Sequence, residues 1–222
     1  IIRIGLPAGI QGVLFSISNV LIQSALNSFG STAIAASSAA GNVEGFVGTT
    51  MNAYSNAALT FTGQNMGAKK YERIDTIAMI CTALVFVTWI ILGGMTILFG
   101  RAFLSLYTSD PEVIDVGMIR MKLLMTTYFT CGIMNVYPGL TRGMGYSILP
   151  MLCTLFGACI MRIVWLATVF SWYPTISMLF LCYPVTWGLA GIGQFISFFY
   201  ARHQIRKKAL LEAQPAEVLG VR

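Results

Sequence analysis

Two charged residues, Glu44 and Arg162, lie deep inside long apolar stretches of this chain. A charged group in such surroundings is costly and indicates a functional site by default. The carboxylate of Glu44 could bind a proton, a sodium ion or a cationic molecule. The guanidinium of Arg162 could neutralise that carboxylate, or contact carbonyl groups at a helix end. Both residues are therefore candidate binding residues, with a purely structural ion pair as the open alternative.

Uncharged polar side chains recur at helical spacing in the same kind of stretch. One stripe consists of Ser16, Asn19, Gln23 and Asn27, at spacings of 3, 4 and 4 residues. In a bilayer such a face must contact other helices or a wet cavity, because an unsatisfied polar group there is costly. Interhelical hydrogen bonding and cavity lining both remain open. The uncharged cavity candidates are Asn19, Gln23, Asn52, Tyr128 and Asn135.

Membrane-spanning helices must position these residues, because the charges of the chain are few and segregated. The chain has 222 residues, of which 56% are hydrophobic and 10% are charged, whereas a soluble domain has about 25% charged residues. The stretches 4–29, 76–100, 123–141 and 163–201 contain no charged residue. Each is about as long as, or longer than, the roughly 20 residues that a membrane-spanning helix needs. The predicted fold class is an all-α, polytopic membrane protein.

Turn and capping signals divide the chain into six predicted helices. Asp110 followed by Pro111, for example, is typical of an N-cap and the first helical position. The predicted helices cover residues 4–28, 32–66, 74–99, 111–140, 150–170 and 175–201. The second is too long for a straight crossing and must protrude, tilt or break. The six-helix lobe spans 1–203, and the basic, then polar tail 204–222 is expected to be disordered.

The distribution of basic residues predicts the orientation in the membrane. Six crossings place both ends of the chain on one side. That side holds nine basic residues: Arg3, Lys69, Lys70, Arg73, Arg142, Arg202, Arg206, Lys207 and Lys208. The opposite loops hold Arg101, so the positive-inside rule places both ends in the cytoplasm. Because the chain starts at Ile1 and enters a helix almost at once, we expect a fragment, or half, of a longer polypeptide.

Depth along the helices suggests a partner for Glu44. Glu44 lies 12 residues beyond Thr32, and Arg162 lies 12 residues beyond Pro150, which corresponds to roughly 18 Å in each case. The two helices enter from opposite faces, so both side chains are predicted near the bilayer midplane.

Two further expectations concern helix surfaces. Arg120 and Lys122 lie near the outer end of their helix and are expected to extend outward or to pair with Asp115 or Glu112. The glycines Gly41, Gly45 and Gly48 predict a close-packing surface more than a binding loop.

Several classes of chemistry lack the residues that they need. The single histidine, His203, lies in the basic tail, which excludes a histidine metal site within the membrane. No P-loop or dinucleotide-binding glycine motif follows a strand, and the five cysteines show no CxxC spacing. The net charge of +6 is explained by the topology, so no nucleic-acid partner is expected. We expect a protein that is not an enzyme and has no cofactor.

Five short motifs follow one another along the chain. They are Gly5-Leu-Pro7, Ala35-Ala-Ser-Ser-Ala-Ala-Gly-Asn-Val-Glu44, Gly63-Gln-Asn-Met-Gly-Ala68, Tyr107-Thr-Ser-Asp-Pro-Glu112 and Arg142-Gly-Met-Gly145. In this order they resemble the C-terminal six-helix lobe of MATE (multidrug and toxic compound extrusion) transporters, over about residues 1–205. Each motif alone is weak, and the specificity comes from their order and spacing.

The resemblance implies a twelve-helix antiporter of two six-helix lobes, with a substrate cavity between them. Such proteins export amphipathic, often cationic compounds in exchange for H⁺ or Na⁺. The implied partners are the lipid bilayer, these small molecules and an N-terminal lobe of the same polypeptide. The implied location is the bacterial plasma membrane. Rocking of two lobes about a midplane site suits alternating access.

Two departures from the family pattern concern the coupling ion. Relatives often carry an acid in the first helix of this lobe, where this chain has amides and hydroxyls, and in the fourth helix, where it has Asn135. Coupling then rests on the other lobe or on Glu44. Two other functions stay open: a flippase for lipid-linked or amphiphilic metabolites, which a cationic lining around Arg162 would support, and a non-transporting membrane subunit.

Overall fold

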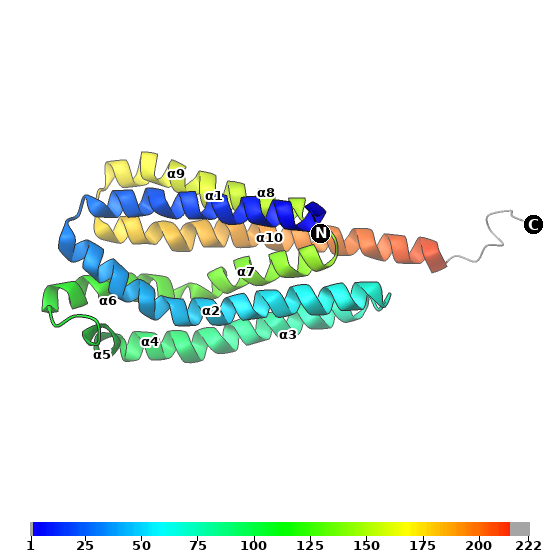
Figure 1. Cartoon of the computed structure of the whole chain (residues 1–222), viewed down its shortest axis with the longest axis horizontal. Helices are drawn as coiled ribbons and strands as arrows, with labels where there is room; N and C mark the ends of the chain where they lie inside the picture. The colour runs from blue at the N-terminus through cyan, green and yellow to red at the C-terminus, as the bar shows by residue number, and fades with distance from the viewer. Residues whose placement is uncertain (1, 214–222) are drawn as a thin grey trace, which may run out of the picture.

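The computed structural model describes residues 2–213, which form helices joined by short turns (Figure 1). In chain order the helices are α1 (Ile2–Asn27), α2 (Ser31–Gly67), α3 (Arg73–Thr88), α4 (Gly94–Leu98), α5 (Gly100–Ser105), α6 (Pro111–Thr126), α7 (Tyr128–Gly143), α8 (Ile148–Thr154), α9 (Met161–Trp165) and α10 (Ile176–Ala213). Three π-helical segments, η1 (Trp89–Gly93), η2 (Leu155–Ile160) and η3 (Leu166–Phe170), continue the helices that precede them. Over these residues there is no strand, which confirms the predicted all-α fold.

The long elements lie side by side along one axis, as Figure 1 shows. Four spans in the described part of the chain are long and apolar enough to cross a bilayer: Gly5–Asn27, Arg73–Leu98, Ile148–Phe170 and Ile176–Leu210. The start of α1 and the end of α10 lie at the same end of the bundle, together with the α2–α3 and α7–α8 turns. Consecutive long elements therefore alternate in direction, as a polytopic membrane fold requires.

Helix α7 lies at the centre of the packing, against α2 and α10. Small residues on α7 let it approach its neighbours closely. A Cβ atom added to Gly139 would lie 2.4 Å from the carbonyl oxygen of Ser55 on α2. The close-packing surface predicted for Gly41 and Gly45 is wrong, because neither has a neighbour within 4 Å of an added Cβ. The side of α2 that carries Gly41 and Gly45 has no close neighbour in the described chain, whereas Gly48, the third glycine of the predicted set, lies against Tyr128.

Two predicted helix boundaries also need correction. The helix predicted over 111–140 is interrupted at Thr127, whose backbone leaves the helical region at φ −112° and ψ 10°, and α7 starts at Tyr128. The last helix does not end at 201 but continues to Ala213. Residues 204–213 contain no glycine or proline and consist mainly of good helix formers, so the predicted disorder is wrong there. The rest of the predicted tail, 214–222, lies outside the described residues.

Other local predictions agree with the observed elements. Asp110 caps α6, because its side chain accepts a hydrogen bond from the backbone N–H of Glu112 at 2.9 Å, and Pro111 follows at the first helical position. The long second helix does not break: α2 is continuous over 37 residues. Helix α10 holds Pro184 within its 38 residues.

Candidate substrate cavity

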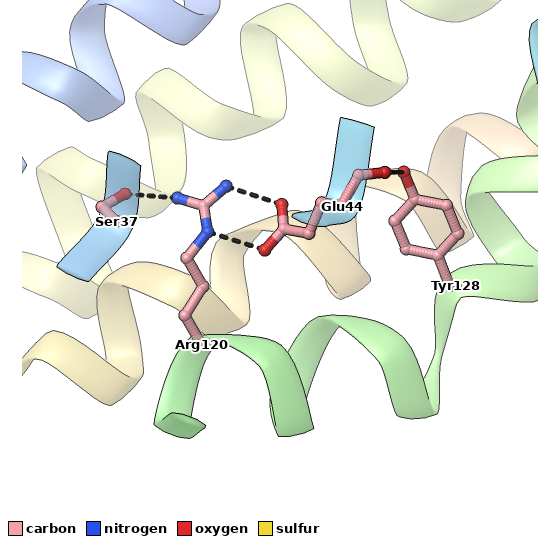
Figure 2. A network of polar contacts seen from close by, with 4 residues as sticks. All are labelled: Ser37, Glu44, Arg120 and Tyr128. Atoms are coloured by element: carbon pink, nitrogen blue, oxygen red, sulfur yellow. Dashed lines mark hydrogen bonds and ion pairs between the residues drawn. The ribbon is translucent and has the colours of Figure 1, made fainter. Parts of the chain in front are cut away.

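Glu44 on α2 forms a bidentate ion pair with Arg120 on α6 (Figure 2). Nε of Arg120 donates to Oε1 of Glu44 at 2.8 Å, and Nη2 donates to Oε2 at 2.8 Å. The remaining terminal nitrogen, Nη1, donates to the hydroxyl oxygen of Ser37 at 2.6 Å. The side chains of Arg120 and Glu44 are 12% and 10% exposed. The planar guanidinium fork matches a carboxylate in this geometry, so the carboxylate of Glu44 is neutralised.

Two predictions about these charges are wrong. Glu44 does not pair with Arg162, and Arg120 does not extend outward to Asp115 or Glu112. Asp115 instead accepts a hydrogen bond from Arg101 at 2.5 Å. The physical reason is that α2 and α6 begin at the same end of the bundle.

A depth comparison along α6 would have found the correct pair. Arg120 lies nine residues beyond Pro111, so it is roughly 14 Å along its helix. Glu44 is roughly 18 Å along its own. Helices that enter from the same side bring these two levels together, within the length of an arginine side chain.

Arg162 on α9 is fully buried and has no carboxylate partner among the described residues. Its Nη1 donates to Oδ1 of Asn19 at 2.5 Å and, more weakly, to the hydroxyl of Ser18 at 3.5 Å. Its Nε and Nη2 are buried without a hydrogen-bond partner in residues 2–213. The rings of Phe15 and Tyr183 lie with their centroids 4.8 and 4.9 Å from the guanidinium carbon. Within residues 2–213 the hydrogen-bond and ring partners of this cation are all neutral.

A cavity of about 490 Å³, called here the main cavity, lies between α1, α2, α6, α7, α9 and α10. Its lining consists of Phe15, Asn19, Gly48, Asn52, Arg120, Tyr128, Cys131, Met134, Asn135, Arg162, Tyr183 and Trp187. The structure thus brings together Asn19, Asn52, Tyr128, Asn135 and Arg162 of the predicted site residues. Glu44 lies directly behind the lining residue Arg120. Gln23 is not part of the cavity: it is exposed and contacts Asn27 at 3.4 Å.

The break between α6 and α7 shapes one wall of the main cavity. Directly after Thr127, Tyr128 places its ring over α2, and its hydroxyl donates to the backbone oxygen of Glu44 at 3.5 Å (Figure 2). A Cβ added to Gly48 would lie 3.1 Å from this hydroxyl, so glycine permits the approach. The ring of Tyr128 meets Trp187 of α10 edge-on, with the centroids 5.5 Å apart.

A second pocket of about 280 Å³ adjoins the main cavity and shares Phe15, Asn52, Met134 and Asn135 with it. Its polar wall is a hydrogen-bonded chain between helices. Arg142 of α7 donates to Oε1 of Gln11 on α1, and Nε2 of Gln11 donates to the hydroxyl of Thr154 on α8 at 2.6 Å. Gln194 of α10 donates to the same hydroxyl at 3.1 Å.

Sequence reasoning missed several lining residues. The sequence predicts that Arg120 extends outward or pairs with Asp115 or Glu112, and the aromatic residues Phe15, Tyr183 and Trp187 carry no signal in an already apolar sequence. Gln11 offered a signal, because it precedes Ser18 by two helical turns on the same side of α1 and is polar within an apolar run. The rest depends on which helices are neighbours.

The fold and cavity define a helical membrane protein with a polar, partly charged interior site. Residues 7–168 match the sequence profile of the MatE family. Since that match covers most of the chain, the chain belongs to the MatE family, whose members are transporters and not enzymes.

Two curated relatives and one solved structure illustrate the similarity. The probable multidrug resistance protein YoeA of Bacillus subtilis is 24% identical over 159 residues, which cover 70% of this chain and 34% of that protein. The FAD transporter of Shewanella oneidensis is 23% identical over 192 residues, 86% of this chain and 42% of that protein. The crystal structure of the Vibrio cholerae MATE transporter VcmN in the bent form superimposes with a TM-score of 0.83, at 20% identity, over 92% of this chain and 46% of that one. The chain therefore spans less than half the length of these relatives.

Proposed function

We propose that this chain forms one lobe of a secondary active antiporter that exports amphipathic compounds in exchange for H⁺ or Na⁺. The observation that carries the proposal is the main cavity. Its volume of about 490 Å³ lies within the usual range of small-molecule sites, about 300–1,000 Å³. Its lining combines aromatic faces with amide and guanidinium groups, which suits a molecule with both apolar and polar parts.

An N-terminal lobe of the same polypeptide is the proposed partner. The relatives are more than twice as long as the matched part of this chain. Helix α2 offers an uncovered face at Gly41 and Gly45, on the element that also carries the cavity residues Gly48 and Asn52. A second lobe on this side would complete the wall of the cavity, and relative motion of the two lobes would give alternating access.

The proposed location is the bacterial plasma membrane, with both ends of the chain in the cytoplasm. Basic side chains outnumber acidic ones at one end of the bundle, where a surface depression is lined by Lys69, Lys70, Arg73, Arg202 and Arg206 together with Glu72 and Asp75. This asymmetry is the pattern of the positive-inside rule.

Glu44 is the candidate within this lobe for binding the coupling ion or a cationic substrate. To take up H⁺, Na⁺ or a cationic compound, its carboxylate would exchange Arg120 for the new partner. The alternative is that an acid of the other lobe binds the coupling ion and that Glu44 holds Arg120 in place. The two roles differ in one respect. If Glu44 binds the ion or substrate, its ion pair with Arg120 must open during the transport cycle, whereas a structural role requires the pair to stay closed.

A flippase for lipid-linked or amphiphilic metabolites is the second candidate. It is favoured by the cationic lining at Arg162, which has no carboxylate partner among the described residues. The name of the FAD transporter of Shewanella oneidensis indicates a relative with a large, phosphate-bearing cargo.

The test is transport by the full-length polypeptide reconstituted into vesicles, with a set of fluorescent amphipathic dyes of different charge. Export that requires an imposed pH or Na⁺ gradient is the expected result. Asn135→Leu, inside the cavity, is expected to reduce export, whereas Gln23→Leu, outside it, is the matched control. Absence of transport for every dye and gradient would support a non-transporting subunit instead.

A further inference from the structure

The lining of the main cavity that the described residues provide carries an excess positive charge. Two guanidinium groups line it, those of Arg120 and Arg162, and no acidic side chain does. Glu44 neutralises Arg120 from behind. Every other Asp and Glu within residues 2–213 lies at or near an end of the bundle. Within residues 2–213 the charge of Arg162 is therefore left without an anionic partner.

The adjoining pocket adds to the same imbalance. Arg142 lines it, again without an acidic residue in the lining. The hydrogen bond of Arg142 goes to the neutral amide of Gln11, and its Nε is buried without a partner among the described residues. The two connected spaces thus hold two cations with only amide and hydroxyl partners.

A buried guanidinium whose N–H groups have no hydrogen-bond partner can bind an anion. Burial of an uncompensated charge is energetically unfavourable, and Arg162 is 0% exposed. Asn19 satisfies one of its nitrogens at 2.5 Å, while Nε and Nη2 stay unused. These two nitrogens form one edge of the guanidinium fork, which matches the two oxygens of a carboxylate or phosphate.

Aromatic side chains surround Arg162 as well. Tyr183 contacts both guanidinium groups, with its ring centroid 4.9 Å from the central carbon of Arg162 and 5.4 Å from that of Arg120. Trp187 packs on Tyr183 with a centroid distance of 5.6 Å and lines the same cavity. A planar ring can therefore stack here while its anionic group reaches Arg162.

The backbone around Arg162 is unusual as well. Its five-residue helix α9 lies between the π-helical segments η2 and η3. Such segments are rare overall, and those that occur are often found at functional sites. They change the direction in which side chains leave the helix. Here they accompany the one fully buried arginine of the described chain.

We propose that the main cavity binds an aromatic organic anion, with Arg162 as the counter-ion of a carboxylate or phosphate group. This inference rests on the proposed transport function and reverses the charge expected of the cargo. In this arrangement Glu44 serves to neutralise Arg120, so that one cation and not two faces the ligand. An anionic ligand compensates the buried charge of Arg162, whereas a cationic ligand adds to it.

The test compares dyes that share a ring system and differ in charge. Fluorescein is a xanthene carboxylate, and rhodamine 123 is a xanthene cation. A second pair, 4-methylumbelliferyl phosphate and 4-methylumbelliferone, distinguishes a phosphate ligand from its uncharged parent. Binding to the purified full-length polypeptide is measured by fluorescence anisotropy, and transport is measured separately in vesicles.

The proposal expects fluorescein or the phosphate to bind more tightly than its matched dye. Arg162→Gln is expected to weaken anion binding by about tenfold or more, as loss of a charged hydrogen bond does, and to leave rhodamine 123 binding unchanged or stronger. Arg162→Lys, which keeps the charge, is expected to retain part of the affinity. Arg101→Gln removes an arginine that lies outside the cavity and pairs with Asp115, so it is the matched control.

Each outcome decides one of the two proposals. Tighter binding of rhodamine 123 by the wild type, or no binding of either anion, would overturn the anion site even if Arg162→Gln did not fold. Binding of an anion that depends on Arg162, without transport under any gradient, would support the site and contradict the transport function. Gradient-driven export of rhodamine 123 alone, insensitive to Arg162, would support transport and contradict the anion site.

Discussion

Arg120 and Glu44 join α6 to α2 through two parallel N–H···O hydrogen bonds of 2.8 Å, and this pair is the charge contact that links these two helices within the main cavity wall. Both helices begin at the same end of the bundle, so the ion pair fixes the position of α6 along α2. Removal of one partner leaves the other buried and charged.

Glu44→Gln is therefore expected to lower the stability of the protein strongly. The loss of one member of a buried ion pair costs about 3–5 kcal/mol, because the remaining charge has no partner. The double variant Glu44→Gln with Arg120→Gln is expected to lose less than the sum of the single variants. Thermal unfolding of the purified full-length polypeptide measures the effect. A Glu44→Gln protein as stable as the wild type, but unable to export dyes, would instead assign Glu44 to ion coupling.

Gly139→Ala is expected to disturb the contact between α7 and α2. The added Cβ would lie 2.4 Å from the carbonyl oxygen of Ser55, and overpacking of this kind costs about 1–3 kcal/mol. Gly94→Ala on α4 is the matched control, because nothing lies within 4 Å of its added Cβ and alanine favours a helix over glycine. Equal thermal stability of the two variants would contradict the close helix approach.

Gln11→Leu is expected to loosen α1. Its amide contacts Arg142 on one side and Thr154 on the other, and α1 has few other polar links to α7 and α8. Loss of both hydrogen bonds is expected to cost about 2–3 kcal/mol, since one of them is to a charged group. Faster hydrogen–deuterium exchange confined to α1 would show it. Gln23→Leu on the same helix, whose amide is exposed, should leave that exchange unchanged.

Asp75→Asn is expected to have a small, salt-sensitive effect. Asp75 accepts two hydrogen bonds of 2.7 Å from Arg202, but its side chain is 60% exposed. Pairs in such a setting contribute about 0.2–1 kcal/mol and weaken with ionic strength. The difference in unfolding temperature between the wild type and this variant should therefore be smaller at high salt than at low salt. A loss as large as that of Glu44→Gln, independent of salt, would contradict this weak role.

Much of the site was predictable as a set of residues, but not as a set of contacts. Asn19, Asn52, Tyr128, Asn135 and Arg162 do line one cavity. Their polarity within apolar stretches was sufficient to single them out, since lipid cannot satisfy them. Whether they bind a ligand remains a prediction.

The contacts required three-dimensional information. A side chain's partner depends on which helices are neighbours and on how far a flexible side chain reaches. Gln23 has the same polarity and helical spacing as Asn19 and still lies outside the cavity, because Ile22 and Leu26 occupy the buried side of α1 at this level and Gln23 is exposed.

The sequence by itself determined the all-helical membrane fold, the family and the single interior acid, because hydropathy, charge spacing and turn residues act locally along the chain. Only the tertiary structure decided that Glu44 pairs with Arg120 and that Arg162 has no carboxylate partner in the described part of the chain. That assignment follows from the helix arrangement: α6 runs in the same direction as α2 and brings its arginine to the level of Glu44. The balance of charge in the cavity is therefore a property of the packing and not of the composition.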